Sequence, residues 1–558
     1  MTDAAPSSPL DGAAALARAG RWEEAEAVAQ RRLAVDPQDA DALNFLGGVA
    51  RARGDCRRAE QFYADALRCR PNFAKARSNL GAVLLEMGRI QEAVEHLQKT
   101  VAADPHFADA RVNLGTALLN AGDPVAAERE LRAALAAVPD DALALNSLGN
   151  AMFHQGRIDE AIAAFERALE REPSMTMALN NLGTAWREKG EQAKAEEALR
   201  CAVAAAPDFA EAWSGLGVVL RERGRLDEAR AAHERALAIK PGLATARFSR
   251  GIIALGDGRF EDGFADYRAR PLPEADRLFR EILPDDLSKK AVLLLPNQGL
   301  GDELFFLRFA PALKRRGASL IYRSTTAIAT IVARSGAVDR VFRDEDPAPE
   351  HDLALSIGDL PHALGVKSAR DLPPPLALPA DDRASAEAAD ILARLGPPPY
   401  VALTWRAGTR DWNALLKTVP LAALGGALAG LPGTLIALQR APDPGEIEAL
   451  SAAAGRPAHD LSALNRDLEA MLGVLHRIDA YVAVSNTNVH LRAGTARACH
   501  VLVPHPPEWR WMNAGDRSPW FPEFPLYRQR AADAPGAGWD EALAALRRDV
   551  AAFLAAVS

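Results

Sequence analysis

The sequence predicts a chain of two kinds of structure: an α-helical solenoid over nearly half its length, followed by an α/β region with parallel strands. Two observations predict the solenoid. Glycines recur every 34 residues from Gly20 to Gly258, and prolines recur at the same interval from Pro37 to Pro241. The α/β region is predicted because this interval stops after Arg270, where short apolar runs begin to alternate with helical segments.

One repeat unit, beginning at Ala76, shows why the interval produces paired helices. Ala76 opens an apolar stripe at helical spacing, and Gly88 ends this first helix because a left-handed backbone is needed there. A second helix is predicted over residues 89–102, before Pro105 stops it. A 34-residue period of Ala, Leu-Gly, Gly and Pro is the signature of tetratricopeptide repeats, which stack into a superhelix with a concave groove.

The ends of the array depart from the regular pattern. Six full repeats are predicted between about Ala42 and Pro241, with a partial helix pair before them around Gly20. A degenerate unit follows over 247–270, where Gly263 stands in the usual place of alanine. Terminal repeats are expected to be atypical because one of their faces meets no neighbour.

Asparagine recurs beside the Leu-Gly pair of several repeats. It is found directly before the leucine at Asn79, Asn113 and Asn181, and one place earlier at Asn44, Asn146 and Asn180. An amide carries both a donor and an acceptor, so such a column can hold an extended peptide backbone without reading its side chains. All of these except Asn44 are predicted to bind a protein acceptor; the alternative is that they bond the helices to each other.

Composition narrows the class of protein. A net charge of −8 argues against a nucleic-acid binder, and the four scattered cysteines argue against a disulfide framework or a zinc site. Residues 1–12 have neither the basic nor the apolar part of a secretory signal, and the sequence has no run of about 20 apolar residues. We therefore expect a soluble cytoplasmic protein without a metal.

The second half reads as two successive series of strands and helices. Buried parallel strands are predicted at 291–295, 319–322, 340–342, 353–356, 400–405, 434–438, 480–485 and 500–503, with helices at 303–316 and 540–555. Proline-rich segments separate the two series, which predicts two Rossmann-like lobes with a cleft between them. The predicted domains are a solenoid over 11–270, a linker over 271–285, and lobes over 286–380 and 397–558.

Several motifs of this half carry a resemblance. Gly299-Leu-Gly-Asp302-Glu-Leu, followed by Arg308-Phe-Ala-Pro311, resembles the N-terminal motif of bacterial heptosyltransferase-like glycosyltransferases. Ser485-Asn-Thr-Asn-Val-His490 resembles their late Asp-Thr-Gly-x-x-His motif, with Asn486 in place of Asp and Asn488 in place of Gly. Trp405-Arg406-Ala-Gly408 and Lys417 resemble the strand-end and basic residues between these motifs.

The fused architecture resembles bacterial flagellin glycosyltransferases and, more distantly, the repeat-bearing O-linked N-acetylglucosamine transferases. The segment 507–522 looks like the aromatic tail of such fusions. The resemblance implies a GT-B fold, a sugar nucleotide donor bound in the cleft, a protein hydroxyl as acceptor, and transfer without a bound metal. It also implies a narrower reading, in which a nonulosonic acid passes from a CMP-linked donor to Ser or Thr of flagellin.

Sugar transfer needs a base for the acceptor hydroxyl and positive groups for the leaving phosphate. Asp302 matches the base of the family motif, with helix capping as its alternative role and Glu303 as a second candidate base. The predicted donor-binding residues are Gly301, Arg406, Lys417, Asn486, Thr487, Asn488 and His490. For Arg406 and Lys417 the alternative is a solvated charge, and for His490 it is packing against the sheet.

Two further features stay open at this point. Asp344-Glu-Asp346 matches the Asp-x-Asp metal motif of another glycosyltransferase fold, but it lies in an acidic stretch that predicts a solvated turn. The aromatic side chains Trp509, Trp511, Trp520 and Phe521 can either stack on a base or sugar or fix their loop to the core.

Three functions are compatible with these residues. The first is a protein O-glycosyltransferase whose repeats hold the acceptor and whose sugar nucleotide is a co-substrate rather than a cofactor. The second is a non-catalytic repeat scaffold with a degenerate transferase domain. The third is a glycosyltransferase acting on lipopolysaccharide, against which the long solenoid argues, because a lipid-linked sugar needs no such groove.

Overall fold

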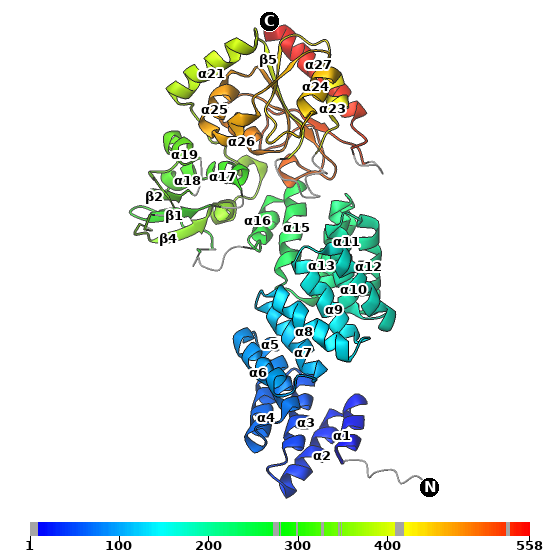
Figure 1. Cartoon of the computed structure of the whole chain (residues 1–558). Helices are drawn as coiled ribbons and strands as arrows, with labels where there is room; N and C mark the ends of the chain where they lie inside the picture. Colours follow the sequence, from blue (N-terminus) through cyan, green and yellow to red (C-terminus); the bar gives the residue numbers. More distant parts are fainter. Residues whose placement is uncertain are drawn as a thin grey trace. The chain divides into compact units, whose positions relative to one another are not determined.

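The computed structural model describes residues 9–271, 278–279, 281–296, 299–324, 328–343, 346–347, 349–407, 418–531 and 536–557. The chain divides into two compact units, Met1–Asp208 and Phe209–Ser558. Figure 1 shows paired helices throughout the first unit, and helices together with both sheets in the second. The predicted combination of a helical solenoid with a region of parallel sheets is confirmed.

The helices of the first unit follow the repeat period. They are α1 Pro9–Arg18, α2 Trp22–Val35, α3 Ala40–Ala52, α4 Cys56–Cys69, α5 Ala74–Glu86, α6 Ile90–Ala103, α7 Ala108–Asn120, α8 Pro124–Ala137, α9 Ala142–His154, α10 Ile158–Arg171, α11 Thr176–Glu188 and α12 Gln192–Ala205. The glycine after each first helix, from Gly20 to Gly258, has a φ between 74° and 86°. The predicted left-handed helix end is therefore confirmed.

The glycine of each Leu-Gly pair is needed for helix packing, not for a left-handed backbone. A Cβ on Gly47 would lie 2.5 Å from Cε1 of Tyr63, which is sixteen positions later on the second helix of the same repeat. The same relation joins Gly81 to Leu97, Gly115 to Leu131, Gly149 to Phe165 and Gly183 to Leu199. Glycine at this position lets the two helices of a repeat approach closely enough to bury a large side chain between them.

Two more helix pairs belong to the second unit: α13 Ala210–Glu222 with α14 Leu226–Ile239, and α15 Ala244–Gly256 with α16 Phe260–Tyr267. In the last pair, a Cβ on Gly263 would lie 2.7 Å from Cδ2 of Leu255, so alanine would not fit there. The departure from the repeat pattern at Gly263 thus allows a closer final packing.

Histidine replaces the usual large apolar residue in one of these pairs. His233 of α14 faces Gly217 of α13, where the earlier repeats have leucine, phenylalanine or tyrosine. Its side chain is fully buried, and neither ring nitrogen has a hydrogen-bond partner among the described residues. Burial lowers the pKa of His233 to about 3, with smaller contributions from Arg221 and Arg250, so the ring is neutral near pH 7.

The sheets of the second unit are both parallel. The first contains β1 Ala291–Leu295, β2 Ser319–Arg323, β3 Arg340–Phe342 and β4 Leu353–Ser356, in the order β3-β2-β1-β4. The second contains β5 Tyr400–Thr404, β6 Thr434–Ala437, β7 Ala458–Asp460, β8 Ala480–Val484, β9 His500–Val503 and β10 Leu526–Arg528, in the order β10-β9-β8-β5-β6-β7. Every strand predicted from an apolar run is present, while the three-residue strands β7 and β10 were not predicted.

Helices cover these sheets. They include α17 Leu300–Leu307, α18 Ala310–Arg315, α19 Ala329–Ser335, α20 Leu360–Ala363, α21 Asp382–Leu395, α23 Leu421–Leu428, α24 Glu446–Ala454, α25 Leu468–Arg477, α26 Thr487–Gly494 and α27 Asp540–Val557. The single helix predicted over 303–316 is wrong in two respects. It begins earlier, at Leu300, and it is interrupted before Pro311, whose missing N–H suits the first turn of a new helix.

The last helix pair packs into the core of the α/β region. Phe260 of α16 meets Trp520 at 5.2 Å between ring centroids, and Tyr267 meets Trp509 at 6.0 Å. At the end of α16, the buried guanidinium of Arg270 forms an ion pair with Asp359. All four aromatic side chains left open in the sequence are buried, which favours their role in the core over stacking on a ligand: Trp509, Trp511, Trp520 and Phe521.

Candidate functional site

A cavity of about 460 Å³ lies at the carboxyl ends of strands in the second sheet. Thr404 ends β5, Gln439 follows β6, and Ser485 follows β8, and all three line this cavity. From β5 the strand order runs to β6 on one side and to β8 on the other, so the cavity lies at a topological switch point. Ligands of open parallel sheets bind at such points.

The N-terminus of α17 forms a second side of the cavity. Gly299, with a φ of 66°, occupies the N-cap position, so the capping role considered for Asp302 falls to a residue without a side chain. The carboxylate of Asp302 instead accepts a hydrogen bond from Arg510 and lines the cavity. Burial acts to lower the pKa of Arg510, but the negative charges of Asp302 and Glu508 outweigh it and raise the pKa overall.

Glu303, the second candidate base, points elsewhere. Its carboxylate is buried and accepts a hydrogen bond from the hydroxyl of Tyr322 on β2. Burial, together with the neighbouring Glu303 charge, raises the pKa of Tyr322, so this hydroxyl stays protonated near pH 7. Glu303 is therefore not among the residues that line the cavity.

Arg406 lies at the cavity wall but is firmly held. Its guanidinium bonds Glu446 of α24 at 3.0 Å and the carbonyl oxygen of Ala441 at 2.8 Å, and its backbone N–H donates to Gln439. Burial acts to raise the pKa of Glu446, but the hydrogen bonds from Arg406 and from backbone and indole N–H groups lower it overall. Arg406 is thus a paired and largely buried charge rather than a solvated one.

The motif around α26 forms a third side. Asn486 caps the helix by accepting from the N–H of Val489, and its amide also donates to the Val484 carbonyl. Thr487 lines the cavity at the first residue of α26, and Asn488 donates to the side chain of Asn465 at 3.2 Å. Asn486 therefore keeps the capping role that an aspartate would have there, without the charge.

His490 stands at the cavity wall, next to α17. It lines the cavity, and its ring also packs against Phe305 and Phe521, with centroid distances of 6.0 and 5.6 Å. Burial, followed by the charges of Arg510 and Arg308, lowers the pKa of His490 to about 3. A close approach to α17 is possible because Gly301 has no Cβ, which would lie 3.0 Å from Cδ2 of this ring.

Several polar residues of the cavity were not predicted as site residues: Gln439, Arg440, Asn465, Glu508 and Arg510. The last two alternate with Trp509 and Trp511 in a short segment of sequence. Charged and aromatic residues in alternation indicate a segment with one polar and one apolar side. This pattern in the sequence could have identified Glu508 and Arg510 as candidate site residues. For Gln439 and Arg440, position after a strand end was the only clue, and Asn465 follows β7, a strand that the sequence did not predict.

The asparagine column bonds one repeat to the next. Asn79 donates to the side-chain oxygen of Asn44 and Asn181 donates to that of Asn146, each at 3.0 Å. Asn113 donates to the hydroxyl of Ser78 at the same distance. These bonds favour the structural alternative for the amide nitrogens of Asn79, Asn113 and Asn181, while no such bond of Asn180 is found among the described residues.

Some predicted positions lie outside the described residues. These are Lys417, together with Gly408, and Asp344 and Glu345 of the Asp-x-Asp match. Within the described ranges, no group of three or more His, Cys, Asp or Glu side chains is arranged to hold a metal ion. In the same ranges, no helix has the length and apolar character to cross a bilayer.

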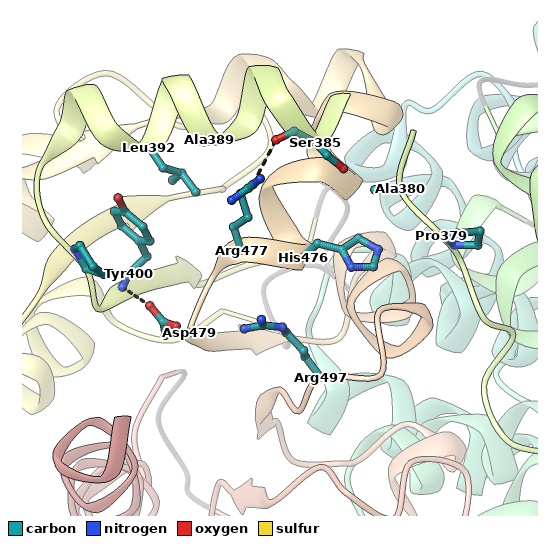
Figure 2. A pocket seen from close by; sticks show the side chains of 11 residues that line it. Pro379, Ala380, Ser385, Ala389, Leu392, Tyr400, His476, Arg477, Asp479 and Arg497 are labelled. Carbon is teal, nitrogen blue, oxygen red and sulfur yellow. Dashed lines mark hydrogen bonds between the residues drawn. The ribbon is translucent and has the colours of Figure 1, made fainter. Parts of the chain in front are cut away.

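A larger cavity, of about 630 Å³, lies at the opposite ends of the strands (Figure 2). Tyr400 and Asp479, which line it, stand at the beginnings of β5 and β8, and the Tyr400 N–H donates to Asp479 at 2.7 Å. The Arg477 guanidinium donates to the carbonyl of Ser385, at the end of α25 where a basic residue complements the helix dipole. The smaller cavity, in contrast, lies at the topological switch point and is lined by the motif residues, so it is the candidate site.

Comparisons with known proteins concern the repeats. The family model of the tetratricopeptide repeat matches residues 10–72, 78–142, 114–176, 147–208 and 193–244. No curated protein matches the chain. Among solved structures, YrrB, described as a tetratricopeptide-repeat protein with an unusual peptide-binding site, is 26% identical; the match covers 33% of this chain and 95% of YrrB, with a TM-score of 0.27.

Two other solved structures are similar to the chain at lower identity. A tetratricopeptide-repeat protein from Parabacteroides merdae is 14% identical over 44% of this chain and 97% of its own, with a TM-score of 0.38. A chain of the APC/C hetero-tetramer Cut9–Hcn1 is 18% identical over 43% of this chain, with a TM-score of 0.41, and only 48% of its length is spanned. From the matched family model and the helix pairs, the N-terminal region of this chain is an array of tetratricopeptide repeats.

Proposed function

We propose that the chain is a protein O-glycosyltransferase, in which the repeats hold a protein acceptor and a GT-B domain transfers a sugar to it from a nucleotide donor. The observation that carries the proposal is the meeting of two motifs at one cavity. Asp302 of the first motif follows a strand of the first sheet, and the second motif follows a strand of the second sheet, yet Asp302, Ser485 and His490 line the same 460 Å³ space. Both motifs resemble those of heptosyltransferase-like enzymes.

The strand orders support the same proposal. Numbered from the first strand of each sheet, they run 3-2-1-4 and 6-5-4-1-2-3, the second being the order of a Rossmann sheet. A GT-B enzyme has two such lobes and binds its donor at the carboxyl ends of the strands. The cavity, with its switch point between β5 and β8, has this position in the second sheet.

The reaction assigns one role to each side of the cavity. The acceptor hydroxyl oxygen attacks the anomeric carbon, its proton passes to the carboxylate of Asp302, and the bond from that carbon to the phosphate oxygen breaks. The leaving phosphate gains negative charge, which the backbone N–H groups at the start of α26 and the cation Arg440 are positioned to stabilise. Sugar nucleotide is a co-substrate in this scheme.

The acceptor is a polypeptide because the repeats precede this domain, and tetratricopeptide arrays hold peptides or proteins in their groove. Flagellin, modified at Ser or Thr with a nonulosonic acid from a CMP-linked donor, is the specific acceptor and donor that the motif resemblance proposes. The domain limits proposed with it are 11–270 for the repeats, and 286–380 and 397–558 for the two lobes.

A second candidate is a non-catalytic scaffold, and one observation favours it. Asp302 is bound to Arg510, and Asn488 is bound to Asn465, so residues expected to act on a ligand are engaged with one another. The scaffold would use the repeats for assembly and the cavity for binding alone.

The test uses full-length protein, a panel of sugar nucleotides and candidate acceptors, with intact mass as the measure of transfer. Asp302→Asn should bind the donor normally and lose transfer by about 100-fold or more, since a general base contributes 10²–10⁴-fold. Asp382→Asn is the matched control, because Asp382 is also an aspartate in the first turn of a helix but lies outside the cavity. Undiminished transfer by Asp302→Asn would overturn the assignment, and donor binding by wild-type protein without transfer to any acceptor would favour the scaffold.

A further inference from the structure

One segment of the second unit contacts both the cavity and the end of the repeat array. Within residues 504–524, here called the bridging loop, Glu508 and Arg510 line the cavity. Trp509, which stands between them, is buried and meets Phe264 of α16 at 6.4 Å between ring centroids. Residues Trp509–Trp511 form a short 3-10 helix.

The guanidinium of Arg510 lies against two aromatic rings. Its central carbon lies 4.5 Å from the ring centroid of Trp509 and 4.8 Å from that of Phe305. The Nε atom is buried and has no hydrogen-bond partner among the described residues, while Nη2 donates to Asp302. Since a planar guanidinium stacks on aromatic rings and pairs with a carboxylate in a preferred geometry, these contacts restrict the orientation of Arg510.

Asp302 lies in the first turn of α17 and lines the cavity. Its carboxylate forms an ion pair with Arg510, which comes from the bridging loop. An oriented, charged base is what proton transfer from a hydroxyl requires.

The last repeats hold the bridging loop in place. Asn513 donates its backbone N–H to the carbonyl of Gly256 at 2.9 Å and its side-chain amide to Asp257 at 2.7 Å, both at the end of α15. A Cβ on Gly256 would lie 2.5 Å from the side chain of Asn513, so a larger residue there would displace this side chain.

We propose that Arg510 is a positioning residue for Asp302, and that the packing of the bridging loop against α15 and α16 keeps Arg510 in place. The proposal rests on the proposed transferase function for the role of Asp302. It also makes the final repeat pair part of the architecture of the site.

The test compares Arg510→Gln and Arg510→Lys in the full chain, with Arg383→Gln as control because Arg383 is exposed on α21. With Arg510→Gln we expect kcat to fall by about 10- to 100-fold while the KM for the donor changes little, the size of effect that misplacement of a catalytic group produces. Loss of the neighbouring cation disfavours the carboxylate form, so the acid limb of the rate profile should move to higher pH.

Arg510→Lys should restore the acid limb to its wild-type position, because it restores the charge, and should recover only part of kcat. Glu508, Arg308 and the neutral His490 also face this region, and they are unchanged in all of these variants. A kcat and an acid limb equal to wild type in Arg510→Gln would overturn the proposal.

A separate measurement distinguishes this proposal from the proposed function. Urea unfolding of Asp302→Asn, Arg510→Gln and the double variant should show non-additive changes, because the two side chains interact. If wild-type protein transfers no sugar, the transferase proposal fails while this cycle still tests the pair. Additive changes would overturn the positioning role whatever the outcome of the transfer assay.

Discussion

Gly217 and His233 lie so close that a Cβ on the glycine would be 2.5 Å from Cε1 of the imidazole. The corresponding positions of the preceding repeats hold Tyr63, Leu97, Leu131, Phe165 and Leu199. A neutral histidine without hydrogen-bond partners among the described residues thus occupies a site built for an apolar side chain.

His233→Leu should therefore stabilise the second unit. An unsatisfied buried polar group costs about 1–3 kcal/mol, which leucine would remove at pH 8. The measurement is urea unfolding of the full chain, with His106→Leu as control because His106 is exposed. A lower stability for His233→Leu at pH 8 would contradict this account.

The same substitution should change the pH dependence of unfolding. The folded-state pKa of His233 is about 3, below its ordinary value of 6.5, so the unfolded state binds more protons between these values. The histidine form is thus most stable above pH 6.5 and loses about 2 kcal/mol by pH 5. The gain from leucine should be larger at pH 5 than at pH 8 by that amount, and an equal gain at both would show that His233 is not buried as described.

Adjacent glycines of α3 offer a matched pair of tests of the repeat packing. Gly47→Ala should destabilise the first unit by about 1–3 kcal/mol, because its Cβ would overlap the buried ring of Tyr63. Gly48→Ala should stabilise it by about 0.5–1 kcal/mol, since the nearest atom would lie 3.8 Å away and alanine favours a helix. Thermal unfolding monitored by circular dichroism measures both, and changes of the same sign would contradict the prediction.

The asparagine column can be tested for both of its roles at once. Replacing Asn79, Asn113 and Asn181 together by alanine should lower the stability of the first unit, by about 1 kcal/mol for each bond lost between repeats. If the column also binds acceptor, as proposed, the variant should bind acceptor more weakly at temperatures where it is fully folded, with donor binding unchanged. Wild-type acceptor affinity in the folded variant would leave the column with its structural role alone.

Truncation tests where the second unit begins. A chain of residues 209–558 should fold cooperatively, whereas a chain of residues 286–558 should aggregate, because it lacks the partners of Trp509 and Trp520 on α16. Size-exclusion chromatography and near-UV circular dichroism distinguish the two outcomes. A monomeric 286–558 fragment with a native near-UV spectrum would show that α15 and α16 are dispensable for this core.

Much of the fold was accessible from the sequence because its signals are local. The 34-residue period fixes each helix pair, and the glycine at each helix end has the conformation that its position predicts. Apolar runs reveal the buried strands, but β7, with the sequence Ala-His-Asp, and β10, with three residues, are too short to produce such a run. The start of α17 was misplaced because Gly299, which has no capping side chain, ends the turn.

The candidate site was only partly accessible, for a different reason. Motifs identify the sides of the cavity formed by α17 and α26, since each motif is a continuous stretch of sequence. The pairing of Asp302 with Arg510 joins residues 208 positions apart and depends on how the bridging loop folds over the core. The spacing of residues in the sequence therefore could not predict that contact.

The two-sided packing of the bridging loop also constrains how this chain can be rearranged by recombination. An exchange of repeat arrays between related chains preserves the cavity only if α13–α16 stay with the sheets, so a productive crossover lies near Asp208 rather than at the end of the periodic sequence. Repeats before that point belong to the other compact unit. Sequence differences that alter what the array binds are therefore expected mainly in the first unit. Substitutions in the last two helix pairs should be accompanied by substitutions in the bridging loop.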